Sequence, residues 1–76
     1  MYYKYKVTWY NSYKDEEQKD EGMVFAKDYS VAADRVVNDY GKDAVINIYL
    51  YEIYNEGDGF CISKYEIDSA FQTKDA

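Results

Sequence analysis

The residues that could carry chemistry in this sequence of 76 residues are few, and histidine is not among them. Histidine is the commonest general base and the usual partner of a serine or cysteine nucleophile. Cys61 is the single cysteine, so a zinc site has almost no suitable ligands and no disulfide can form within the chain. Because apolar residues flank Cys61, we expect it to be a small packing residue. The sequence therefore predicts no enzymatic activity, no metal site and no cofactor.

Carboxylates gather in one segment, which contains Asp15, Glu16, Glu17, Asp20 and Glu21. Five carboxylates against one lysine give residues 15–21 a local charge of −4. Nothing nearby in the sequence would bury these groups and raise a pKa for acid–base catalysis. Two interpretations remain, a solvated connector and a surface that contacts a protein partner. A second polar segment, Glu56–Gly59, lacks the ligand spacing of a calcium loop and the lysine of a phosphate loop, so it predicts a hairpin turn.

Eleven tyrosines are the most unusual feature of the composition. A tyrosine ring is a large apolar surface with a hydroxyl at its tip, which suits a surface that is wet when alone and buried when bound. Packing between neighbouring strands explains tyrosines equally well. Stacking on a nucleobase is a third interpretation, in which Lys4, Lys6 and Arg35 would neutralise the phosphate of a small nucleotide.

The charge balance limits the partners. Fifteen acidic residues against nine basic ones give a net charge of −6, which repels the nucleic-acid backbone and suits basic proteins. The first seven residues do not resemble a signal peptide, and no stretch is long and apolar enough to span a membrane. With one cysteine, the expected location is a reducing cytoplasm.

The elements that position these residues follow from periodicity. Residues 3–10 alternate like a half-buried strand, residues 11–22 read as a long exposed hairpin loop, and residues 23–26 return as a second strand. An amphipathic helix is expected over residues 28–40, capped by Asp28 and ended by Gly41. Residues 44–54 and 60–62 are strand candidates around the turn at 55–59. The spacing of Ser63 and Glu66 predicts a capping box for a short helix to about Phe71, and residues 72–76 should fray.

These elements predict one α+β domain over residues 1–76, with the order strand, strand, helix, strand, strand, short helix. The main helix is expected to cover one sheet face, made of Tyr3, Tyr5, Val7, Trp9, Ile46, Ile48 and Leu50. The uncovered face would then carry Lys4, Lys6, Tyr10, Tyr49 and Tyr51. A chain of this size has a thin core, so we expect either a homo-oligomer or a face reserved for a partner.

The succession of a tyrosine-rich first strand (3–10), an acidic loop, the helix opening at 24–30 and the strand at 45–50 resembles small orphan proteins of bacteriophages. Many of these, including anti-CRISPR and other anti-defence proteins, are short, acidic, cytoplasmic and non-enzymatic. The resemblance covers most of the chain and rests on general character, without a signature motif. It implies stoichiometric binding to a host defence protein or to a nucleotide messenger, and it assigns no functional residue.

Our leading expectation is a non-enzymatic inhibitor in the host cytoplasm that occludes a host protein, one with a basic surface. The expected contacts are an aromatic sheet face and the acidic loop: Tyr10, Tyr49, Tyr51, Asp15, Glu16, Glu17, Asp20 and Glu21. The alternative is a protein that sequesters a signalling nucleotide in a tyrosine-lined pocket at a subunit interface, through Lys4, Lys6 and Arg35. A structural or assembly component is a third class.

Overall fold

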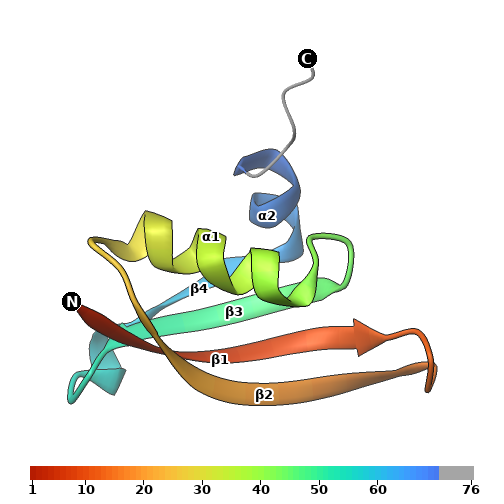
Figure 1. Ribbon diagram of the computed structural model, residues 1–76, viewed down its shortest axis with the longest axis horizontal. Helices are drawn as coiled ribbons and strands as arrows, with labels where there is room; N and C mark the ends of the chain where they lie inside the picture. The colour runs from red at the N-terminus through yellow and green to blue at the C-terminus, as the bar shows by residue number, and fades with distance from the viewer. Residues whose placement is uncertain (71–76) are drawn as a thin grey trace.

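The computed structural model describes residues 1–70, which form a four-stranded antiparallel sheet with both helices on one face (Figure 1). The elements in chain order are β1 (Tyr2–Asn11), β2 (Glu16–Phe25), α1 (Tyr29–Tyr40), β3 (Val45–Glu52), the 3₁₀ turn η1 (Glu56–Asp58), β4 (Phe60–Ser63) and α2 (Lys64–Ala70). The strands are arranged β2-β1-β3-β4. The predicted α+β fold and its element order are confirmed. The tail expected to fray, residues 72–76, and the predicted helix end at 71 lie outside the described residues.

Helix α1 begins and ends where its sequence predicts. The Asp28 carboxylate accepts a hydrogen bond from the Val31 N–H (2.9 Å), which satisfies one of the free donors of the first turn. At the other end, Gly41 has a φ of 93°, a conformation that L-residues rarely adopt, and its N–H donates to the Val37 carbonyl. The small side chains of Ala32 and Ala33 lie in the core, so the helix can approach the sheet closely.

Helix α2 begins with the predicted capping box. The Glu66 carboxylate accepts from the Ser63 N–H (2.9 Å), and the Glu66 N–H donates to the Ser63 hydroxyl (3.3 Å). Ile67 then enters the core and is fully buried. Across residues 1–70, no helix has the length and apolar character needed to cross a membrane.

The core lies between the helices and one face of the sheet. It is built from β1, β3, both helices and the β2–α1 connection, and it consists of Tyr3, Val7, Ala26, Ala32, Ala33, Val36, Val37, Val45, Ile48, Leu50 and Ile67. Tyr5 and Trp9 pack against its margin, on the side of the sheet where the sequence places them. The predicted helix-covered face is therefore confirmed with one exception.

The exception is Ile46, which was expected to face the helix beside Ile48. Trp9 pairs with Val45 and Thr8 with Asn47, so the β1–β3 register shifts by one residue at this point. The extra residue of a β-bulge reverses which side chains face the core. Val45 consequently is fully buried, whereas Ile46 is half-buried and outside the core cluster.

The predicted exposed loop over residues 11–22 is wrong. Only residues 12–15 form the turn, and β2 starts at Glu16 and pairs with β1 along its whole length, from Asn11–Glu16 to Tyr2–Phe25. The segment 16–21 is too polar to signal a strand by its own propensity. Its pairing is decided by β1, a ten-residue strand whose backbone groups need partners on both edges.

Candidate protein-binding surface

The acidic segment lies at the free end of the β1–β2 hairpin, which extends past α1 in Figure 1. Asp15 belongs to the turn, and the other four carboxylates belong to β2. Side chains alternate along a strand, so Glu17 and Glu21 share the sheet face without helices, and Glu16 and Asp20 lie on the helix side. All except Asp20 are exposed. The segment is therefore a rigid, two-sided acidic edge and not a connector.

Asp20 is half-buried because it packs under aromatic residues. Its carboxylate accepts a hydrogen bond from the Trp9 indole N–H (3.2 Å), and the Trp9 ring lies 5.7 Å from that of Tyr40. Burial raises the pKa of the Tyr40 hydroxyl above its usual range, with further contributions from the neighbouring Tyr5 and Asp20. These contacts fasten the hairpin to the end of α1, which holds the acidic edge at a fixed angle to the core.

The hairpin turn presents a tyrosine that sequence reasoning did not select. The Asn11 side chain accepts hydrogen bonds from the N–H groups of Tyr13 (3.0 Å) and Lys14 (3.3 Å), and Asp15 closes the turn with a positive φ of 55°. Tyr13 is completely exposed in this tight turn. The signal that could have located it is the turn chemistry of Asn11 with Asp15, which leaves four loop residues between the strands.

The predicted aromatic sheet face is only partly free. Tyr10 is 39% exposed near the hairpin end, whereas Tyr51 is only 7% exposed and Tyr49 is half-buried. The expectation that Tyr51 is an exposed contact residue is therefore wrong. The reason is the chain between β3 and β4, which folds back so that the backbone of Gly59 lies directly against both tyrosines.

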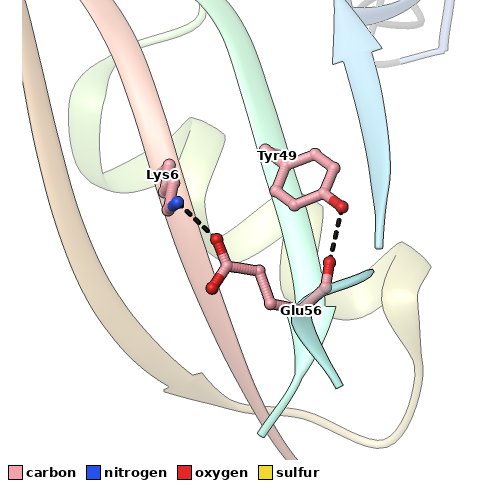
Figure 2. A network of polar contacts seen from close by, with 3 residues as sticks. All are labelled: Lys6, Tyr49 and Glu56. Carbon is pink, nitrogen blue, oxygen red and sulfur yellow. Dashed lines mark hydrogen bonds and ion pairs between the residues drawn. The ribbon is translucent and has the colours of Figure 1, made fainter. Parts of the chain in front are cut away.

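A polar network holds this returning chain in place, as Figure 2 shows. The Lys6 ammonium is paired with the Glu56 carboxylate at 2.6 Å, and the Tyr49 hydroxyl donates to the Glu56 carbonyl at 2.6 Å. The hydrogen bond and charge of Glu56 raise the pKa of Lys6. Two side chains that the sequence suggests for a ligand are thus used inside the fold.

The turn that leads into η1 exposes a second tyrosine in an unusual conformation. Tyr54 has a φ of 68° and is completely exposed, and the Asn55 N–H donates to the Glu52 carbonyl (2.9 Å) across it. A tyrosine in this region of conformational space is disfavoured, and glycine or asparagine is the usual choice. Neither Tyr54 nor Tyr13 gains stability from burial.

The three basic residues proposed for a nucleotide do not meet in one chain. Lys4 and Lys6 lie on the helix-free face of the sheet, whereas Arg35 is exposed on α1, which covers the opposite face. Lys6 is also engaged with Glu56. A site using all three cations would have to be completed by a second copy of the chain.

The remaining chemistry-bearing positions form no cluster. Cys61 is free and exposed on β4, so its prediction as a packing residue is wrong: it faces the helix-free side of the sheet, opposite Tyr49. The Glu56–Gly59 segment forms the predicted connection between strands, as a 3₁₀ turn. Among residues 1–70, no three cysteine or acidic side chains gather as a metal would require.

Comparison of the chain with protein-family models, curated proteins and solved structures found no match.

Proposed function

We propose that this chain is a non-enzymatic binding protein that covers a basic surface of a partner protein with the free end of its β1–β2 hairpin. The observation that carries the proposal is the combination of charge and rigidity there. Asp15 and the four carboxylates of β2 lie on an ordered hairpin, next to the exposed rings of Tyr10 and Tyr13. Neither ion pair found among residues 1–70 uses one of these carboxylates.

Such a surface has the composition of a protein interface that stays soluble when unoccupied. Carboxylates steer a basic partner toward the hairpin and raise the rate of association. Tyrosine rings then supply buried area at a low entropic cost, because each has only two side-chain torsions. A backbone held by strand pairing needs little further ordering when the partner binds.

We further propose that the partner is a protein of a bacterial host. The resemblance to small phage proteins supports a host protein, in particular a defence protein whose basic surface normally meets nucleic acid. In this proposal the chain acts in the host cytoplasm, by occupying that surface stoichiometrically.

The test compares two variants with the same change of charge. In the first, Asp15, Glu16, Glu17, Asp20 and Glu21 are changed to their amides. In the control, five exposed carboxylates elsewhere are changed in the same way: Asp34, Asp39, Asp43, Asp58 and Asp68. Proteins captured from a bacterial lysate by the immobilised parent are identified, purified and measured for association kinetics with all three forms.

We expect the hairpin variant to associate several-fold more slowly than the parent at low salt, with little change in dissociation, and the control variant to match the parent. Equal slowing by both variants would mean that net charge alone is responsible. Unchanged kinetics in the hairpin variant would show that these carboxylates do not contribute to partner binding and serve only solubility.

A further inference from the structure

β2 is an edge strand, so one of its backbone edges has no partner within residues 1–70. The Ala26 N–H donates to the Met1 carbonyl (3.0 Å), which makes these residues a hydrogen-bonded pair at the end of the β1–β2 ladder. On the other side of β1, the Tyr10 N–H donates to the Ala44 carbonyl (2.8 Å), so the backbone groups of Tyr10 point toward β3 and away from β2. Hydrogen-bonded and non-bonded pairs alternate in an antiparallel ladder. The residues of β2 whose backbone groups point outward are therefore Glu17, Lys19, Glu21, Met23 and Phe25.

Charged side chains border this edge on both sides. Glu17 and Glu21 stand on the helix-free face, Glu16 and Asp20 stand on the helix face, and Lys19 is the only cation of the strand. Four carboxylates against one lysine give β2 a formal charge of −3. A strand laid along the edge would bring its side chains to about 5 Å from these groups.

The other end of the edge is apolar. Tyr2, Met23 and Phe25 form what we call the apolar corner, on the helix-free face at the end of β2 that leads into α1. The rings of Tyr2 and Phe25 contact each other edge to face, with centroids 4.9 Å apart. Each of the three side chains is more than half exposed, at 54% to 59%. Exposed apolar side chains beside unpaired strand backbone are the features of a site for strand addition.

We propose that β2 is the docking edge for an extended, basic segment of the partner protein, which pairs with it as a further strand of the sheet. The inference rests on the proposed function and names how the partner is held. Complementarity defines the segment: basic residues opposite Glu17 and Glu21, and apolar residues opposite Met23 and Phe25, at every second position.

A second copy of this chain is the less suitable occupant. Pairing of two β2 strands brings together two segments of charge −3. Charged edge strands of this kind are how proteins avoid edge-to-edge self-association. A basic segment reverses the sign of that interaction and uses the same backbone groups.

The probe for the test is a cyclic β-hairpin peptide whose outer strand reads Val-Thr-Val-Thr-Lys-Thr-Glu-Thr-Lys, antiparallel to β2 from Phe25 to Glu17. Cyclisation lowers the cost of ordering the peptide. In a second peptide, the outward amides of the Val, Lys and Glu residues are N-methylated, which keeps charge and shape but prevents pairing with β2. Binding is followed by titration with chemical-shift mapping of the backbone amides.

Two variants of Lys19 separate strand pairing from simple attraction of charge. Lys19→Pro removes an outward N–H, a position where edge strands accept proline, and Lys19→Thr removes the same charge and keeps the N–H. We expect the dissociation constant to rise at least tenfold for Lys19→Pro, and to stay within about threefold of the parent for Lys19→Thr. Urea unfolding verifies that both variants are folded.

The N-methylated peptide tests the proposal even if Lys19→Pro does not fold, because this peptide is used with the unchanged protein. We expect the N-methylated peptide to bind at least tenfold more weakly than the unmethylated peptide. Equal binding of the two peptides, or no saturable binding at millimolar peptide, would overturn strand addition. Sedimentation showing a dimer that Lys19→Pro dissociates would make a second copy the occupant and also overturn it. If the amide variant of the hairpin loses the partner while Lys19→Pro retains it, the proposed function stands and strand addition fails.

Discussion

Replacing Tyr54 with glycine should stabilise the fold, although it removes the largest side chain of its turn. Tyr54 adopts a φ of 68°, and its side chain is completely exposed. The left-handed conformation costs an L-residue roughly 1–2 kcal/mol, a cost that glycine avoids. Glycine loses more backbone freedom on folding, by about 0.5–1 kcal/mol. Because no burial is lost, the net change should be a gain of about 0–1.5 kcal/mol, the difference between these two terms.

Tyr13 provides a matched control for this prediction. It is equally exposed and lies in the other tight turn, but only Asp15 and Tyr54 among the described non-glycine residues have a positive φ. Tyr13→Gly therefore pays the entropic cost without relief of strain, and should lose about 0.5–1 kcal/mol. The two variants remove the same side chain and should change stability in opposite directions.

The assay is urea unfolding of the parent and both variants, with thermal melts in parallel. In a domain of this size, 1 kcal/mol shifts the melting temperature by about 4–8 °C, so the two variants should be clearly separated. A Tyr54→Gly variant that is less stable than Tyr13→Gly would refute the reasoning. A stabilised variant would show that Tyr54 is maintained at a cost in stability, as expected for a residue whose ring serves a contact outside the chain.

Three further predictions concern the core, the returning chain and the sheet–helix contact. Val36→Asp places an unpaired carboxylate in the fully buried face of α1, so cooperative urea unfolding should be lost. Gly59→Ala should lower the free energy of unfolding by about 1–3 kcal/mol, because the new methyl group meets the backbone carbonyl of Leu50. Gly22→Ala should lower it by less, because its methyl group meets only the outer end of the Tyr5 side chain, which can move. Equal losses of stability in urea unfolding would contradict this prediction. The pKa of Tyr40 is raised in the fold, so its contribution is fully present below about pH 10 and is lost as pH rises further. Tyr40→Phe should therefore flatten the decline of unfolding free energy from about pH 10, the unfolded pKa of tyrosine, upward, and an unchanged slope in that range would contradict the contact.

Local signals in the sequence determined both helices. The apolar face of α1 repeats at three and four residues, Asp28 and Gly41 mark its ends, and Ser63 with Glu66 marks the start of α2. Each of these features acts through hydrogen bonds or contacts within about one turn of the chain, so the residue types suffice to predict them. The alternation of β1 is of the same kind, because it reflects which side of a strand is buried.

Contacts between residues far apart in the chain decided the features that local sequence patterns did not predict. β2 is a strand because β1 supplies its partners, although its own residues from Glu16 to Glu21 favour a polar loop. The bulge at Ile46 arises from the register of β1 and β3, and it makes Val45 the buried residue in place of Ile46. Tyr51 is covered because Lys6 and Tyr49 hold the distant Glu56.

The candidate surface divides in the same way. Its charge could be predicted, since five carboxylates within seven residues give the segment the same negative charge whether it forms a loop or an edge strand. Its shape could not, because only the tertiary fold shows that these carboxylates border an open strand edge with an apolar corner at one end. Composition fixes the sign of the field around a segment, whereas hydrogen bonding with a neighbour far along the chain fixes which backbone groups remain free to bind.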